Sequence, residues 1–231
     1  MPKIILASIN NAYYQSLADI TVTKNKLIYC RRYNYIPYFK NKDWHNHIPD
    51  IYQPNTHELG FEKISTILEI MDKYPDSNYI WFTDCDSLIT NLTIKIEDVI
   101  NKYWNNNYLM MASEDGNGLN VGSLVIINSP EAREYCQWIY SQKETYKDKS
   151  WNEQQVIIDS QLFGSYQARI CLVPQNELNA YDYTLYQPHQ FNKPLDKLPS
   201  WKSGDLLIHW PGTNLEERLV LANKYLGLTI S

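Results

Sequence analysis

Short blocks of apolar residues recur along the chain, each bounded by polar, Gly or Pro positions. Such blocks are typical of buried strands. The predicted strands are residues 3–9, 78–83, 108–112, 123–127, 169–173 and 205–210, with a further short strand at 33–36. Residues 175–204 contain three prolines and no clear period, so this segment is predicted to be loop-rich.

Apolar residues at intervals of three and four positions predict helices between these strands. Ile64, Ile67, Leu68 and Met71 form one such stripe, which ends before Pro75. Further helices are predicted within residues 12–30, 96–103, 130–139, 151–159 and 215–226. Because strands and helices alternate, the pattern favours an α/β fold with a mixed, mainly parallel sheet flanked by helices on both faces.

Composition narrows the class of protein. The chain has 231 residues, 44% of them hydrophobic, which is enough to bury a full core and form one domain, or one domain with a small subdomain. Its formal net charge is -5, and it has no long run of Lys and Arg, so nucleic acid is not an expected partner. An anionic substrate would then have to be bound by a local device, such as a cation or a few placed lysines.

The cysteines and the N-terminal segment indicate the compartment. Cys30, Cys85, Cys136 and Cys171 are widely spaced, which predicts neither a zinc cluster nor a disulfide framework. The first apolar run is too short for a signal peptide, and no segment reaches the ~20 apolar residues of a membrane span. We therefore expect a soluble, cytoplasmic protein.

Asp84 and Asp86 directly follow the predicted strand 78–83. In extended chain, side chains two positions apart share a face, and the carboxyl ends of strands are where open α/β sheets bind ligands. Two carboxylates can hold a divalent cation, which stabilises a departing nucleoside diphosphate. The alternative is a capped turn with solvated carboxylates, and the buried strand before the motif argues against it.

His209 lies on the last predicted strand and is followed by Pro211 and Gly212. A lone His on an apolar strand is usually a core or surface residue. Gly212, however, would let backbone N–H groups approach a phosphate. We expect His209 to join Asp84 and Asp86 as a ligand of Mn²⁺ or Mg²⁺, with both strand ends lining one crevice of the sheet.

Four sequence blocks together resemble glycosyltransferase family 34, which contains galactosyl-, xylosyl- and mannosyltransferases. The blocks are YIWFTDCDSLI at 79–89, GLNVGSLVI at 118–126, WNEQQ at 151–155 and IHWPG at 208–212. They occur in the family's order and cover roughly residues 60–215. The segment with Asn25 and Lys26 is also similar to the family's N-terminal helix. The resemblance implies a single GT-A glycosyltransferase domain over residues 1–231.

The resemblance also implies roles for individual residues. Asp84 and Asp86 are similar to the Asp-x-Asp motif, and His209 to the C-terminal metal-binding His. Lys63 is similar to a Lys that approaches the donor, although a solvated helix charge explains it equally well. The remaining donor-binding candidates are Ala7 and Ser8 at the nucleoside, Asn120 and Gly122 at the donor sugar, and Gly212 at the phosphates.

Glu153 and Gln154 are similar to the family's Glu-Gln-Asp segment near the anomeric carbon, with Gln155 in place of the Asp. The implied reaction transfers a sugar from a nucleoside diphosphate sugar, with a UDP-sugar as first choice, to a glycan or glycoprotein acceptor. Retention of anomeric configuration is expected. An inverting enzyme would need a carboxylate base, for which Asp115, Glu114 and Glu153 are the candidates.

Two other functions stay open from the sequence. A carbohydrate- or nucleotide-sugar-binding module without turnover would use the same cleft. A haloacid-dehalogenase-like phosphatase would use Asp84 as nucleophile, although Leu88 stands where that motif usually has Thr or Val. His45 and His47 invite a second metal interpretation, but a solvated loop explains them better. The implied relative is an anchorless protein of bacterial or large-virus type, or a catalytic domain from a longer protein.

Overall fold

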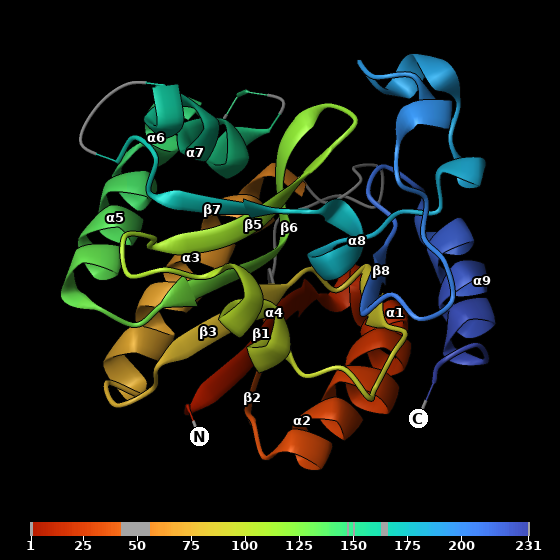
Figure 1. The fold of residues 1–231 in the computed structure, drawn as a ribbon, viewed down its shortest axis with the longest axis horizontal. Helices are drawn as coiled ribbons and strands as arrows, with labels where there is room; N and C mark the ends of the chain where they lie inside the picture. Colours follow the sequence, from red (N-terminus) through yellow and green to blue (C-terminus); the bar gives the residue numbers. More distant parts are fainter. Residues whose placement is uncertain (1, 43–55, 147, 150, 163–165, 231) are drawn as a thin grey trace.

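A sheet of six strands forms the centre of the described chain, which comprises residues 2–42, 56–146, 148–149, 151–162 and 166–230 of a computed structural model (Figure 1). The strands are β1 (Ile4–Asn11), β2 (Ile36–Lys42), β3 (Tyr79–Thr83), β5 (Met110–Asp115), β6 (Gly118–Ile127) and β7 (Ile170–Val173). Their spatial order is β2-β1-β3-β6-β5-β7. Only β6 among them runs antiparallel to its neighbours. The predicted mixed, mainly parallel sheet is confirmed.

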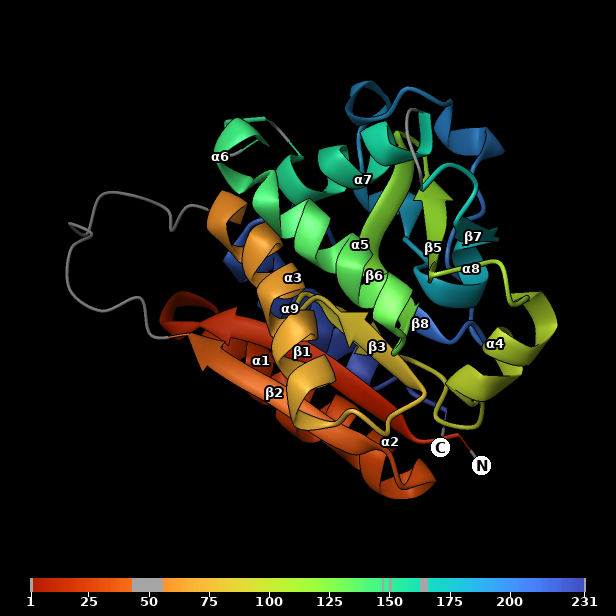
Figure 2. The same ribbon diagram turned by 90° about the vertical axis from the view of Figure 1, so that its left-hand side faces the viewer.

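Helices cover both faces of this sheet, as the strand–helix alternation predicted. One face packs on α3 (Thr56–Lys73), α5 (Pro130–Ser141) and α7 (Asn152–Leu162), and Figure 2 shows α3 and α5 side by side in front of the sheet. The other face packs on α2 (Leu27–Tyr33), α4 (Ile96–Tyr103) and α8 (Gln175–Leu178). Side chains alternate along β1 accordingly, with Ile5 on the first face and Leu6 on the second.

The final predicted strand is not part of the main sheet. β8 (Leu207–His209) pairs antiparallel with the short β4 (Ser87–Ile89), which begins just after the Asp-x-Asp motif. This small sheet packs between α9 (Leu215–Leu226) and the N-terminal helices. The expectation that His209 ends a strand of the central sheet is therefore wrong, because the chain turns away from that sheet after Asp84.

The predicted helix at 12–30 is a composite of several helical forms. It consists of η1 (Ala12–Tyr14), α1 (Gln15–Ala18), the π-helix η2 (Asp19–Lys26) and α2. The helix ends at Tyr33 because Asn34 adopts a left-handed conformation, and β2 starts only at Ile36. The strand predicted at 33–36 therefore lies further along the chain.

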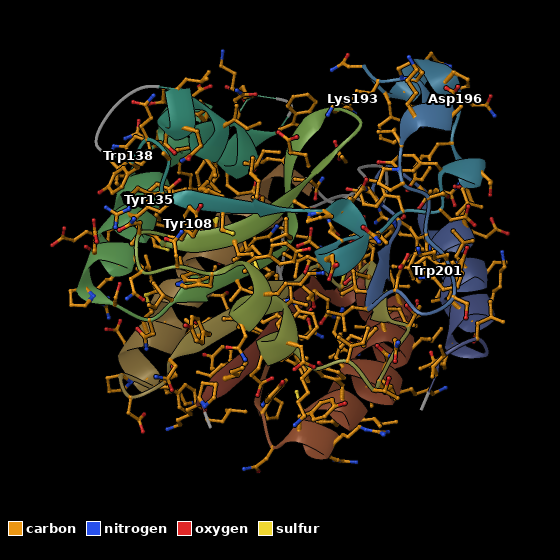
Figure 3. The ribbon with its side chains drawn as sticks, viewed as in Figure 1. Tyr108, Tyr135, Trp138, Lys193, Asp196 and Trp201 are labelled. Carbon is orange, nitrogen blue, oxygen red and sulfur yellow. The ribbon has the colours of Figure 1, made fainter. Side chains whose placement is uncertain are left out.

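The segment after α8 is loop-rich, as predicted. It contains three short 3₁₀ turns, η3 (Tyr183–Leu185), η4 (Pro188–Gln190) and η5 (Leu195–Lys197). A further short helix, α6 (Lys143–Tyr146), precedes α7 in the chain. Figure 3 shows Lys193 beside the tip of the β5–β6 hairpin, where its backbone N–H donates to the Gly116 carbonyl at 3.1 Å. The segment thus closes one side of the molecule against that hairpin.

Two negative features hold for the described residues. No helix among them is both long and apolar enough to cross a membrane. The four cysteines are all buried and none forms a disulfide.

Candidate active site

A cavity of about 600 Å³ opens at the carboxyl ends of β1 and β3. Its described lining residues come from β1, α3, the Asp-x-Asp loop, β6, α7 and the β8–α9 connection. They include four carboxylates and two side chains that carry a positive charge. The carboxylates are Asp84, Asp86, Asp115 and Glu153, and the two cations are Lys63 and Arg218. The described lining thus has a formal excess of two negative charges, which suits a bound cation.

Asp84, Asp86 and His209 come together at this cavity. One potential ligand atom of each lies within 4.8 Å of the others. Asp86 Oδ1 is 3.2 Å from His209 Nε2. Their proximity arises from the small sheet, in which Ser87 pairs with His209 and the Trp210 backbone N–H donates to the Asp86 carbonyl at 3.1 Å. Antiparallel pairing, rather than two distant strand ends, joins the motif to the histidine.

Charged neighbours keep Asp86 ionised. Burial opposes its ionisation, but Arg218, with Nη2 3.0 Å from Asp86 Oδ2, and then His209 more than offset this. They hold the pKa of the Asp86 carboxyl well below its usual range. Asp86 therefore offers an anionic oxygen ligand at neutral pH.

Asn179 fixes the orientation of the His209 ring. Its Oδ1 lies 3.0 Å from His209 Nδ1, while its Nδ2 donates to Asn120 Oδ1 at 2.8 Å. Since an amide oxygen only accepts hydrogen bonds, Nδ1 carries a proton, and release of the proton on Nε2 leaves a lone pair facing Asp86. Two acceptor atoms 3.2 Å apart require a proton or a cation between them. The donor set therefore fits a divalent metal ion bound between Asp86 and His209.

Replacing Asn179 with Leu should therefore weaken Mn²⁺ binding by ~10–100-fold, the usual cost of losing a hydrogen bond that orients a ligating His. Isothermal titration calorimetry with MnCl₂ measures the effect. Asn223→Ala on the exposed side of α9 is the matched control and should change nothing. An unchanged Mn²⁺ affinity in a folded Asn179→Leu variant would show that the ring is held by other contacts.

Asp115 lies at the far end of the same hydrogen-bond chain. Its Oδ2 accepts from Asn120 Nδ2 at 3.0 Å and from the Tyr181 hydroxyl at 3.2 Å, and Oδ1 accepts from the Asn117 backbone N–H at 2.7 Å. Burial raises the pKa of this carboxyl. Because both oxygens are engaged, the contacts favour a positioning role over that of a base. Glu114 is half-exposed, 3.9 Å from Lys193 Nζ.

Lys63 is a buried cation at the opposite wall, not a solvated helix charge. Its Nζ lies 3.0 Å from Asp84 Oδ1, 3.4 Å from Glu153 Oε1 and 2.9 Å from the Val121 carbonyl oxygen. Burial lowers its pKa, but Asp84 and Glu153 more than offset this and raise it above the usual value. Burial in turn raises the pKa of Glu153. Lys63 thus fixes both carboxylates at the cavity wall.

Gln154 and Asn120 border the cavity beside this wall. Gln154 Oε1 accepts from the Val121 backbone N–H at 3.1 Å, and Asn120 Oδ1 accepts from the Gly122 N–H at 2.8 Å. Gln154 belongs to α7 and Val121 to β6, so the Gln154 side chain ties these elements together at the cavity, whereas the Asn120 contact lies within β6.

The structure requires glycine at positions 122 and 212 for two different reasons. A Cβ built on Gly122 would lie 2.2 Å from His209 Cε1, so this glycine makes room for the imidazole ring. Gly212 lines the cavity with φ +75°, a conformation that strains other residues. Gly122 also lines the cavity, and its predicted role at the donor sugar stays a prediction.

Ala7 and Ser8 stay predictions as nucleoside-pocket residues. Both are buried within β1, which pairs with β2 and β3 along this stretch, and neither lines the cavity. β1 extends to Asn11, two residues beyond the predicted end. The part of the chain that borders the cavity therefore begins at Ile9, after Ala7 and Ser8. Ile9, Tyr13 and Tyr14 line it instead.

A buried lysine supports the Asp-x-Asp loop from below. Lys26 Nζ donates to the carbonyl oxygens of Asp84 at 2.8 Å and Ser87 at 2.9 Å, and Thr21 Oγ1 donates to the Cys85 carbonyl at 2.6 Å. Both side chains belong to the π-helix η2, a form that often occurs at functional sites. Burial lowers the pKa of Lys26 to about 8.

Several of these residues escaped the sequence interpretation. Thr21, Asn179 and Arg218 belong to no motif, and Lys26 was noted only as part of a resemblance. A buried Lys or Arg has no signature distinct from a surface one until its partners are known. His45 and His47, the second metal candidates, lie outside the described residues.

Comparison with known proteins gives a family match. The model of the galactosyl transferase GMA12/MNN10 family matches residues 3–105. The probable alpha-1,2-galactosyltransferase gmh2 of Schizosaccharomyces pombe is 26% identical over 197 residues, covering 68% of this chain and 53% of the relative. A second alpha-1,2-galactosyltransferase of that yeast is 25% identical, covering 84% of this chain and 56% of the relative. The chain spans about half the length of these relatives.

Solved structures give a match over nearly the whole chain. A glycosyltransferase involved in glycosylation of the major capsid of PBCV-1 is 18% identical with a TM-score of 0.70, covering 96% of this chain and 100% of the other. The galactosyltransferase LgtC is 13% identical with a TM-score of 0.55, covering 95% of each chain. At these identities the likeness establishes the fold.

The sheet order, its flanking helices and the structural matches define a GT-A fold. The family-model match over residues 3–105 and the galactosyltransferase relatives make the chain similar to glycosyltransferase family 34. The haloacid-dehalogenase-like alternative is not retained, because it presumes another fold.

Proposed function

We propose that this protein is a retaining glycosyltransferase that transfers a sugar from a UDP-sugar to a glycan or glycoprotein hydroxyl, with Mn²⁺ or Mg²⁺ held by Asp84, Asp86 and His209. The observation that carries the proposal is the clustering of these three side chains within 4.8 Å at the cavity. When bound there, the ion would act as a Lewis acid toward the departing diphosphate.

The donor sugar would lie between the Asp-x-Asp loop and α7. Lys63, Glu153 and Gln154 border this part of the cavity. The Lys63 ammonium holds the Asp84 and Glu153 carboxylates in fixed positions, so the wall is organised before the donor arrives. Such positioning and charge stabilisation account for much of catalysis in group transfer.

Galactose is the first donor sugar to test, because the relatives named above are alpha-1,2-galactosyltransferases. UDP-galactose carries its sugar in the α configuration, and an α product therefore means retention. In a retaining reaction without a covalent intermediate, the departing phosphate oxygen can accept the acceptor's proton. Asp115 would then position Asn120 rather than remove a proton.

Donor binding is expected to depend on a divalent cation. The cavity has an excess of carboxylates, so UDP should bind at least ~10-fold more weakly in EDTA than in MnCl₂, since one charge-assisted contact contributes ~1.5–3 kcal/mol. Calorimetric titration of UDP in each buffer measures this.

The decisive test of activity is release of UDP or GDP from a panel of nucleotide sugars, with Mn²⁺ present and absent. UDP affinity that EDTA leaves unchanged would exclude the metal-dependent reaction. Tight sugar binding without nucleotide release would instead favour a non-catalytic carbohydrate-binding module.

A further inference from the structure

Arg218 is a second cation of the cavity wall, largely buried, and no sequence motif includes it. Its side chain is 11% exposed, with Nη2 3.0 Å from Asp86 Oδ2 and Nε 3.3 Å from Thr213 Oγ1. The guanidinium also lies over the Tyr14 ring, 5.5 Å from its centroid. These contacts hold a cation in a defined orientation at the cavity wall.

The position of Arg218 sets it in competition with a metal ion. Asp86 Oδ1 faces His209, whereas Oδ2 faces Arg218, so a divalent cation and the guanidinium use the same carboxylate. Asp86 cannot fully compensate a dication and a guanidinium together. Occupation of Asp86 by a dication therefore weakens its hold on Arg218.

The released guanidinium would need another anion close by. Thr213, which contacts Arg218, lines the cavity together with Gly212 and Leu215. A guanidinium presents a planar fork of donors that matches phosphate oxygens better than an ammonium does. On the opposite wall, Lys63 is already shared between two carboxylates.

We propose that Arg218 binds the diphosphate of the donor, and that its ion pair with Asp86 withholds the guanidinium until a divalent cation occupies that carboxylate. This inference rests on the proposed function and adds the order in which the cation and the nucleotide bind. The cation binds first and the nucleotide second, because only the metal-loaded site has a free Arg218.

The Arg218→Met variant should shift two affinities in opposite directions. UDP affinity in saturating MnCl₂ should fall ~10–100-fold, the loss expected for one charge-assisted contact. Mn²⁺ affinity without nucleotide should rise roughly fivefold, because the competing ion pair is gone. Calorimetry measures the first and the electron paramagnetic resonance signal of free Mn²⁺ measures the second.

A metal-free comparison tests the withholding step. In EDTA, Asp86→Asn should bind UDP more tightly than the wild type, because Arg218 no longer faces a carboxylate. Adding Arg218→Met to Asp86→Asn should abolish that gain. Arg218→Lys, which keeps the charge and supports folding, should lose less UDP affinity than Arg218→Met. Arg169→Met, whose side chain pairs with Glu131 outside the cavity, is the control and should alter neither affinity.

The outcomes separate the two proposals. If the wild type binds UDP with Mn²⁺ but Arg218→Met binds it equally well, Arg218 does not contact the diphosphate. If Arg218→Met weakens Mn²⁺ binding, its ion pair only positions Asp86, and the withholding is wrong. A wild type that fails to bind UDP with Mn²⁺ would overturn the proposed function itself, and the assignment of Arg218 with it.

Discussion

Replacing His209 with Ala is expected to weaken Mn²⁺ binding by ~100-fold or more, beyond the range for residues that only orient a ligand. His209 Nε2 lies 3.2 Å from Asp86 Oδ1, and the ring is buried at the cavity wall. Asp86→Asn should cost a similar amount, because the amide keeps the shape but removes the charge. Metal-dependent UDP binding should fall in parallel in both variants.

The double variant distinguishes shared ligation from two separate effects. Ligands of one ion act as a unit, so His209→Ala with Asp86→Asn should cost much less than the sum of the single changes. Manganese titrations of the four proteins give the coupling, and circular dichroism checks the fold. Strictly additive losses in folded variants would remove His209 from the metal site.

The alternation of apolar blocks was sufficient to predict most of the fold. The central strands are continuous apolar runs because helices cover both faces, so their positions are visible in the sequence. The exceptions have local causes. β2 begins late because Asn34 reverses the chain, and β8 leaves the main sheet to pair with β4. Strand pairing depends on contacts between residues far apart in the chain, so the local pattern of apolar residues does not determine it.

The site was predicted as far as its residues carry a motif. Asp84, Asp86 and His209 were named from the sequence, and the structure brings them together. Ala7 and Ser8 are not among the described lining residues of the cavity, whereas Ile9 is, and their role at the nucleoside stays a prediction. The roles proposed for Glu153 and Gln154 stay predictions.

The missed residues share one physical property. Lys26 is a buried cation and Arg218 a largely buried one, and their partners, a backbone turn and a carboxylate, lie far away in sequence. Asn179 reaches His209 from a loop-rich segment. Such groups are recognised by the burial and contacts of the folded chain, since a Lys or Asn in a sequence is usually a surface residue.

Gly122 is the position where the smallest chemical change should have a large effect. A single methyl group at this residue would lie 2.2 Å from His209 Cε1 and 2.6 Å from Nδ1, well inside van der Waals contact. The ring is buried and held by Asn179, so it cannot shift without losing that hydrogen bond or its approach to Asp86.

The Gly122→Ala variant should therefore lose Mn²⁺ affinity by ~10–100-fold, as expected when a ligating His is no longer held in orientation. Gly227→Ala is the control, because the added Cβ would be 3.4 Å from its nearest neighbour and φ is −68°, so Mn²⁺ affinity should not change. In a His209→Ala background the ring is absent, and Gly122→Ala should then add almost nothing. A loss from Gly122→Ala that persists undiminished in the His209→Ala background would mean that Gly122 acts elsewhere, on the donor sugar or on β6.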